Sequence, residues 1–391
     1  MFDFDEIIDR RGTHCSKWDM MEPQYGVSPE EGLAMWVADM DFRPPTEVTA
    51  ALAAEVAHGV FGYFGDERDY IAAIRGWMAR RHGWEVEPEA IFTTHGIVNG
   101  LAICLKAYTE PGDGVILFTP VYHAFGRIIR ANGRVVVEAP LVTGPDGRYA
   151  MDLEALAAAL TGRERMLVFC SPHNPGGRVW TAEEQRALAD FCRAHDLLLV
   201  SDEIHHDLVL PGNRHVPMPI AAPASLERLV MLTATTKTFN IAGALTGNVT
   251  IPDPKLRKPF AAAHLASGTH ANRFGAVMAT AAYAHGDAWV DAVCAYLEGN
   301  AAVFAAGVDA IPGVRMQPMQ ATYLAWVDFA GTGMAAGEFT ERVQKEARIA
   351  PSLGPAFGKG GESWLRFNIG MPRARIEEAV SRLQAAFADL Q

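Results

Sequence analysis

The stretch Thr233-Ala-Thr-Thr-Lys-Thr-Phe-Asn240 decides the fold, because it sets one lysine among hydroxyl residues directly after the apolar run Leu229-Val-Met-Leu232. A short apolar run of this kind is typical of a buried strand. At the end of such a strand Lys237 would lose hydration, which lowers the pKa of its amine and frees it to attack a carbonyl carbon. Most lysines that follow a strand are solvated surface residues. Lys237 therefore indicates a reactive site only if other polar groups join it.

Two more apolar runs end in polar segments of the same kind. The run Leu197-Leu-Leu-Val200 leads into Ser201-Asp-Glu-Ile-His205, and Met166-Leu-Val-Phe169 is followed by Ser171-Pro-His-Asn174. In an open α/β sheet, ligands bind at the edge that the carboxyl ends of the strands form. We therefore expect all three strand ends to face one pocket.

Composition and charge exclude several classes of protein. Apolar residues make up 49% of the 391 positions, enough for a large core, and acidic residues outnumber basic ones by 46 to 34. The chain has no Lys/Arg-rich run, so we expect no nucleic-acid partner. It has no apolar run of bilayer length and no signal-peptide pattern, so we expect a cytoplasmic protein without a membrane partner. The five cysteines are scattered, which favours reduced thiols.

Strands and helices alternate from Ile91 onward, which predicts an α/β fold with a mostly parallel sheet between helices. We expect an N-terminal arm over residues 1–44, a large domain over 45–280 and a smaller C-terminal α+β domain over 281–391, which the arm joins. We expect the long Ala-rich segment Arg273–Val308 to be helical and to carry the chain out of the large domain.

The segment Thr94-His-Gly-Ile-Val98 predicts an anion site. It follows a short apolar strand and places a glycine at the start of a helix. The first turn of a helix offers unpaired backbone N–H groups and the positive end of the helix dipole, which together suit a phosphate. Many helices begin in this way without a ligand, so this segment supports a phosphate site only in combination with the other strand ends.

The run Asp202-Glu-Ile-His-His-Asp207 also allows a different interpretation, since carboxylates and imidazoles are metal ligands. The neighbouring His205 and His206 would point in different directions on either a strand or a helix. No other His/Cys pair has metal-ligand spacing. We therefore expect no metal site.

Taken together, these residues resemble a known family. Asn174-Pro175, Asp202, Lys237 and Arg366 occur in the order and approximate spacing of fold-type-I pyridoxal-phosphate enzymes, the class I/II aminotransferase superfamily. Within it the chain is similar, over nearly its whole length, to the MalY/PatB-type cystathionine β-lyases. The segments that carry this similarity are Trp36-Val-Ala-Asp-Met-Asp-Phe42, Thr119-Pro-Val-Tyr-His-Ala-Phe125, Pro172-His-Asn-Pro175, Ser201-Asp-Glu-Ile-His205 and Lys237-Thr-Phe-Asn-Ile-Ala-Gly243.

The resemblance implies a seven-stranded sheet, the type I fold of PLP-dependent transferases, and pyridoxal 5′-phosphate as cofactor. It implies that Lys237 holds the cofactor covalently and later removes the substrate Cα proton, while Asp202 pairs with the ring nitrogen. Tyr122 would stack on the ring. The other residues implied in cofactor binding are Asn174 and His205 at the ring O3′, Gly96, Ile97, Val98 and Thr236 at the phosphate, and Tyr63 from a neighbouring subunit.

The resemblance also implies a substrate site. Arg366 would bind the α-carboxylate of an amino acid through its planar fork, with Asn174 beside it. Trp36 and Asp39 would belong to an arm that closes over the substrate, although this arm could also be only a packing segment. One departure is the stretch 238–254, which contains no Lys or Arg to clamp the phosphate.

These implications favour a carbon–sulfur β-lyase that cleaves L-cystathionine or a related cysteine S-conjugate to a thiol, pyruvate and ammonia. The same residues allow an aminotransferase acting on an L-amino acid. A non-catalytic, cofactor-bound dimeric binding protein is a third alternative. In each case we expect a homodimer with its sites at the subunit interface.

Overall fold

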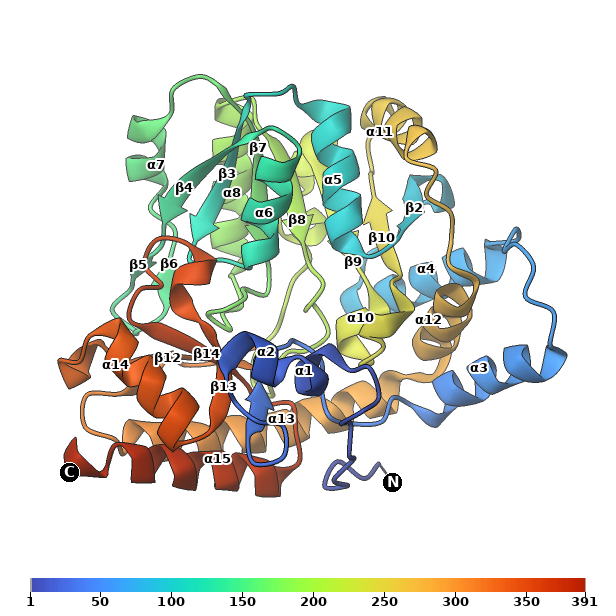
Figure 1. Ribbon diagram of the computed structural model, residues 1–391. Coiled ribbons are helices and arrows are strands. Elements are labelled where there is room, and N and C mark those ends of the chain that lie inside the picture. The colour runs from blue at the N-terminus through green and yellow to red at the C-terminus, as the bar shows by residue number, and fades with distance from the viewer. Residues whose placement is uncertain (1, 391) are drawn as a thin grey trace.

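The computed structural model describes residues 2–390, and a seven-stranded sheet forms the centre of its larger part (Figure 1). The strand order is β2-β10-β9-β8-β7-β3-β4, and β10 runs antiparallel to both neighbours while the others are mutually parallel. The strands span β2 (Ile91–Thr94), β3 (Gly114–Thr119), β4 (Val135–Pro140), β7 (Glu164–Cys170), β8 (Leu198–Asp202), β9 (Leu229–Thr233) and β10 (Gly247–Thr250). The predicted mostly parallel sheet is thus confirmed.

The central strands are apolar throughout because both faces of the sheet are buried. In β3, Val115 and Leu117 belong to one apolar cluster, whereas Ile116 and Phe118 belong to another on the opposite face. A parallel sheet covered on both sides needs such continuous apolar runs rather than alternation. This is why the strands are recognisable in the sequence.

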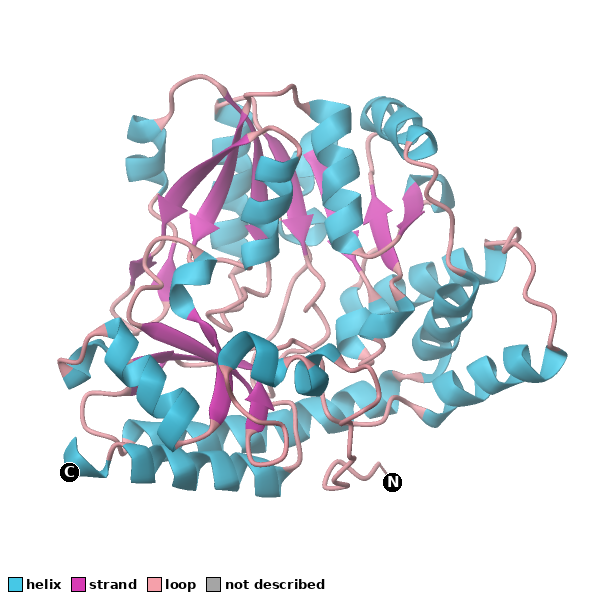
Figure 2. Cartoon of the chain, in the orientation of Figure 1, coloured by secondary structure: helices cyan, strands magenta, loops and turns pink. Residues whose placement is uncertain are grey.

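Helices cover the two faces of this sheet (Figure 2). One face carries α5 (Ile97–Tyr108), α6 (His123–Ala131) and α11 (Pro254–Ala266). The opposite face carries α4 (Arg68–His82), α7 (Leu153–Ala159), α8 (Ala182–Ala194) and α12 (Arg273–His285). α12 also contacts α3 (Thr46–His58), so the segment before α4 lies beside it.

A second, five-stranded sheet lies in the smaller part of the molecule. Its order is β1-β13-β14-β12-β11, with β1 (Leu33–Met35) parallel to β13 (Ile349–Leu353). The N-terminal arm therefore supplies an edge strand to a sheet built from C-terminal residues. The remaining elements here are β14 (Trp364–Asn368), β12 (Leu324–Asp328), β11 (Arg315–Met316), α13 (Asp287–Asp309), α14 (Ala336–Glu341) and α15 (Arg373–Ala386).

The helical character predicted for Arg273–Val308 is confirmed, with one interruption. The structure has two helices, α12 and α13, separated at Gly286, where ψ is 0°. A Cβ atom on Gly286 would lie 2.1 Å from Cε1 of Phe239, so this close approach requires glycine. The interruption depends on a tertiary contact, which the Ala-rich sequence does not reveal.

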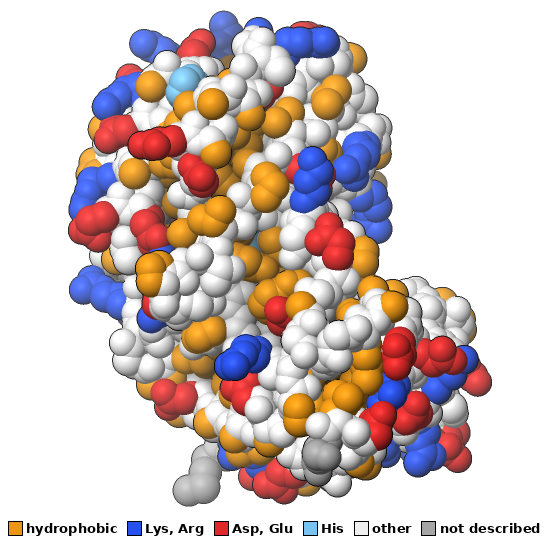
Figure 3. Space-filling view, turned by 90° about the vertical axis from the view of Figure 1, so that its left-hand side faces the viewer, with side chains coloured by type: hydrophobic (Ala, Val, Ile, Leu, Met, Phe, Trp, Pro, Cys, Tyr) orange, Lys and Arg blue, Asp and Glu red, His pale blue; other side chains and the backbone are white. Residues whose placement is uncertain are grey.

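Among residues 2–390, no helix combines the length and the apolar character that crossing a bilayer requires. On the face shown in Figure 3, Lys and Arg side chains are interspersed with Asp and Glu.

Candidate active site

The carboxyl ends of β7, β8 and β9 lie at one edge of the large sheet and border a cavity of about 190 Å³. Nine residues predicted from the sequence line this cavity. They are Gly96, Ile97, Val98, Tyr122, Asn174, Asp202, His205, Thr236 and Lys237. The expectation that three strand ends face one pocket is therefore met.

Lys237 lies in α10 (Thr235–Thr238), the short helix that follows β9. Its Nζ donates a hydrogen bond to the carbonyl oxygen of Ala38, 2.5 Å away in the N-terminal arm. Burial lowers the pKa of the Lys237 amine to about 8, while the nearby carboxylate of Asp39 opposes this change. The amine is therefore closer to its neutral, nucleophilic form at physiological pH than an exposed lysine is.

Asp202 ends β8 and is 2% exposed. Burial raises the pKa of its carboxyl group to about 7, although the backbone N–H of Ile204 donates to Oδ1 at 3.0 Å. None of the described residues forms an ion pair with this carboxyl group within 4 Å. A cationic N–H brought into the cavity would therefore stabilise its ionised form.

The opening turn of α5 presents backbone donors to the same cavity. Gly96 caps the helix with φ of +80°, a conformation that favours glycine, and Ile97 and Val98 follow. These residues and Thr236 line the cavity. The turn offers unpaired N–H groups and the positive end of the helix dipole, which suit a phosphate without the help of an arginine.

Arg366 lies in β14 of the second sheet, so the site is built from both parts of the molecule. Its Nη1 donates to Oδ1 of Asn174 at 3.0 Å, and its Nη2 donates to the carbonyl oxygen of Trp36 at 2.8 Å and to Oγ of Ser352 at 3.1 Å. Burial lowers the pKa of Arg366 to about 10.

Within residues 2–390, the buried guanidinium of Arg366 has no carboxylate partner, and its Nε makes no hydrogen bond. A buried cation without a counter-ion is costly. An incoming carboxylate would supply the missing charge. His205 Nδ1, a second buried polar atom near this site, also lacks a partner. These orphaned groups match the carboxylate and the ring oxygen of the expected substrate and cofactor.

The side chains of Trp36, Asp39, Tyr63 and Arg366 are not among the residues that line this cavity in the same chain, although Arg366 contacts its lining residue Asn174. Trp36 reaches Arg366 through its backbone carbonyl. The Asp39 carboxylate is held by both terminal nitrogens of Arg10 at 3.0 Å. Tyr63 is fully exposed on the loop between α3 and α4.

Asn240 is a positioning residue that the sequence patterns did not single out. Its side chain accepts from the backbone N–H of Met40 and donates to the carbonyl oxygens of Met40 and Phe42. It thereby fastens the arm beside the turn that carries Lys237. Asn240 falls within a quoted motif, but nothing in its spacing indicated a contact some 200 residues away in the chain.

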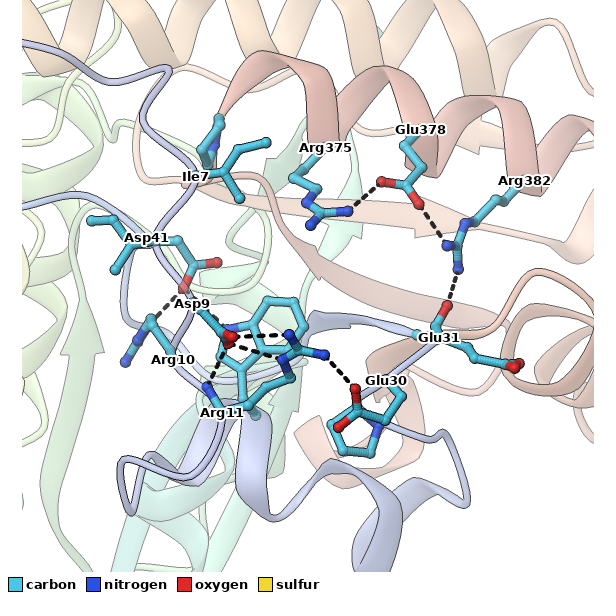
Figure 4. A pocket seen from close by; sticks show the side chains of 15 residues that line it. Ile7, Asp9, Arg10, Arg11, Glu30, Glu31, Asp41, Arg375, Glu378 and Arg382 are labelled. Carbon is cyan, nitrogen blue, oxygen red and sulfur yellow. Dashed lines mark hydrogen bonds and ion pairs between the residues drawn. The ribbon is translucent and has the colours of Figure 1, made fainter.

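A larger cavity, of about 400 Å³, lies between the arm and α15 (Figure 4). Its charged groups largely neutralise one another: Arg11 pairs with Asp9 and Glu30, and Glu378 pairs with Arg375 and Arg382. It contains none of the predicted site residues. Its size therefore does not make it the site of chemistry.

Comparison with known proteins gives one consistent result. The profile of the family described as "Aminotransferase class I and II" matches residues 34–383. Cystathionine beta-lyase PatB of Bacillus subtilis is 37% identical over 388 residues, covering 98% of this chain and 100% of that protein. Protein MalY of Escherichia coli is 32% identical, covering 98% of each. The structure of cystalysin from Treponema denticola, which contains pyridoxal 5′-phosphate, superposes with a TM-score of 0.95 at 32% identity and covers 100% of both chains.

Proposed function

Because the chain belongs to the class I and II aminotransferase family, we propose that it is a pyridoxal-phosphate-dependent carbon–sulfur β-lyase. Its substrate would be L-cystathionine or a related cysteine S-conjugate, cleaved at the Cβ–S bond. With one water molecule consumed, the products are a thiol, pyruvate and ammonia. The observation that carries the proposal is that Lys237 and Asp202 line one buried cavity, beside which Asn174 holds Arg366, a buried cation without a carboxylate partner among the described residues.

Each residue of the site has a role that follows from its surroundings. When bound, pyridoxal phosphate supplies an electron sink for the charge that develops at the substrate Cα. Lys237 would hold the cofactor covalently and then take the Cα proton, since its amine is mostly neutral above a pH of about 8. Asp202 would keep the ring nitrogen protonated through its buried carboxylate. Arg366 would bind the substrate carboxylate through its planar guanidinium.

The remaining cavity residues would position the cofactor. Tyr122 would stack on the ring, and Asn174 and His205 would contact its oxygen. Gly96, Ile97, Val98 and Thr236 would bind the phosphate with neutral donors. Asp39 and Trp36 would position the arm. The backbone carbonyl oxygen of Trp36 accepts a hydrogen bond from Arg366, and the Asp39 carboxylate holds the arm through its ion pair with Arg10.

We also infer a homodimer in which Tyr63 reaches the phosphate of the partner's site. The loop that carries Tyr63 exposes apolar side chains, including Val60 and Phe61, that a second copy would cover. We assign residues 1–44 to an arm, 45–280 to a cofactor-binding domain and 281–391 to a smaller domain. The arm strand β1 in the C-terminal sheet supports this division.

The experiment that tests the function uses L-cystathionine without any keto acid. A β-lyase releases homocysteine, pyruvate and ammonia over many turnovers, while the aldehyde form of its cofactor persists. An aminotransferase would stall after one turnover with the cofactor in its amine form and would resume only when 2-oxoglutarate is added. That second outcome would refute the lyase and support the alternative.

A further inference from the structure

A cluster of two histidines and one aspartate lies outside the active site, on the opposite side of the segment that follows β8. His82 ends α4, and His206 and Asp207 follow β8. The possible ligand atoms of these three residues all lie within 4.8 Å of one another. The neighbouring His205 instead lines the active-site cavity. The two adjacent histidines therefore do point in different directions, but His206 meets a partner from a distant helix.

The hydrogen bond made by His206 fixes how its ring is protonated. Nδ1 of His206 bonds to the backbone carbonyl oxygen of Glu203, which can only accept, so Nδ1 carries the proton. In the neutral ring, Nε2 then presents a lone pair. It lies 3.2 Å from Oδ2 of Asp207, makes no hydrogen bond and is fully buried. Two acceptors at this distance repel each other, so either a proton on Nε2 or a metal ion must lie between them.

The other groups around Asp207 already contact both of its carboxylate oxygens. Oδ1 of Asp207 accepts from Trp77 Nε1 at 2.9 Å and lies 2.7 Å from His82 Nε2, and Oδ2 accepts from Thr238 Oγ1 at 2.8 Å. These contacts hold the carboxylate in place. The nearby Arg80 and Arg81 pair with Asp287 and Asp291, so their charges are matched by other carboxylates.

We propose that His82, His206 and Asp207 form a binding site for a divalent transition-metal ion of the zinc type. Two imidazoles and one carboxylate form a known zinc ligand set, with water in the fourth position. Ligand atoms around a tetrahedral zinc ion lie about 3.3 Å apart for bonds of about 2.0–2.1 Å. The 3.2 Å separation between His206 Nε2 and Oδ2 of Asp207 matches this value. His82 Nε2 lies 2.7 Å from the other carboxylate oxygen, Oδ1, so its imidazole would have to shift to share the ion.

Two further features support a metal site. A carbonyl that accepts from the second ring nitrogen, as Glu203 does for His206, is the usual outer partner of a metal-bound histidine. The cluster also lines a cavity of about 500 Å³, which gives an ion and its water a route of entry. The ion would cross-link the end of α4 to the segment that follows β8. Through Thr238 it would also steady the turn that carries Lys237.

The test measures metal directly and does not use lyase activity. The holoenzyme is stripped with a chelator, mixed with zinc chloride, passed through a desalting column and assayed for metal and thermal midpoint. We expect one zinc ion per chain and a raised midpoint. Cobalt(II) in its place should show the visible absorption bands of a tetrahedral site.

His82→Gln is the main variant, because His82 is the one ligand of the three that lies on a different element, α4, and it lines the cavity. Its zinc affinity should fall by about 100-fold or more, since even outer partners of metal ligands contribute about 10–100-fold. The matched control is His195→Gln, an exposed imidazole at the end of α8, which should bind zinc as the wild type does.

The proposal is overturned if the stripped wild type binds no zinc, or if His82→Gln binds it as tightly as the control. Should the variant fail to fold, a wild-type crystal soaked in zinc decides the question at the zinc absorption edge. An anomalous peak between His82, His206 and Asp207 supports the site, and a soaked crystal without that peak refutes it.

Discussion

Replacing Arg366 with alanine should weaken catalysis without harming the fold. Arg366 is 2% exposed and, among the described residues, its guanidinium contacts only neutral partners: Asn174, Ser352, the carbonyl oxygen of Trp36 and the ring of Phe357. We expect its charge to stay unmatched until a substrate carboxylate binds. The truncation therefore removes an attraction made only by substrate and leaves no protein carboxylate unpaired.

The magnitude follows from the burial of the pair that Arg366 would form. Truncating one partner of a desolvated, hydrogen-bonded charge pair costs about 2–5 kcal/mol. This corresponds to a loss of about thirtyfold to several thousandfold in kcat/KM. Ser352→Ala keeps the charge and removes one neutral contact, so it should cost only about 0.5–1.5 kcal/mol, or about two- to tenfold.

The assay measures the released thiol with a disulfide reagent, because the thiol is the product that both substrates share, and it compares two substrates. One is a cysteine S-conjugate with its free α-carboxylate, and the other is the matching carboxamide, which carries no charge there. Arg366→Ala should slow the first far more than the second. Near-wild-type kinetics on the carboxylate substrate, or equal losses on both, would show that Arg366 does not bind the carboxylate.

Lys237→Ala should give a folded protein. Borohydride reduction should attach no pyridoxal phosphate to it covalently, which peptide mapping would show. In the wild-type apoprotein, the rate at which Lys237 binds pyridoxal phosphate covalently should rise as the pH increases through about 8, because only the neutral amine attacks the cofactor aldehyde. A rate that falls over this range contradicts the assignment of Lys237. Asp41→Asn should lower the free energy of unfolding by about 3–5 kcal/mol, since buried Lys17 loses its carboxylate partner at 2.8 Å. Glu30→Gln, at an exposed ion pair, should lower it by at most about 1 kcal/mol, and equal losses in denaturant titrations would refute the difference. Tyr63→Ala should change the free energy of unfolding by less than about 0.5 kcal/mol. It should nevertheless raise the dissociation constant for pyridoxal phosphate, and an unchanged dissociation constant would show that Tyr63 lies outside the site.

The amino-acid sequence is most informative where one physical requirement dominates. Strands buried on both faces must be apolar throughout, so Leu229–Thr233 and its neighbours are visible as short apolar runs. Polar groups directly after such strands must lie at one edge of a parallel sheet. These two rules are enough to predict that Asn174, Asp202 and Lys237 lie together.

Features that depend on contacts between distant segments could not be predicted. The arm strand Leu33–Met35 pairs with Ile349–Leu353, a register that no local pattern encodes. The break at Gly286 requires the ring of Phe239. Metal-ligand spacing is recognisable only between residues close in the chain. His82 lies 124 positions before His206, although α4 brings the two imidazoles to a ring separation of 4.6 Å.

The arm reaches both cations of the active site through its main chain. The carbonyl oxygen of Ala38 accepts from Lys237, and the carbonyl oxygen of Trp36, two residues earlier, accepts from Arg366. A carbonyl is present whatever the side chain, so these contacts depend on where the arm lies and not on which residues it carries there. Asn240 holds that position by three hydrogen bonds to the arm backbone. A substitution that detaches the arm must therefore remove an acceptor from the amine and from the guanidinium together, which couples the proposed cofactor-binding group to the proposed substrate-binding group.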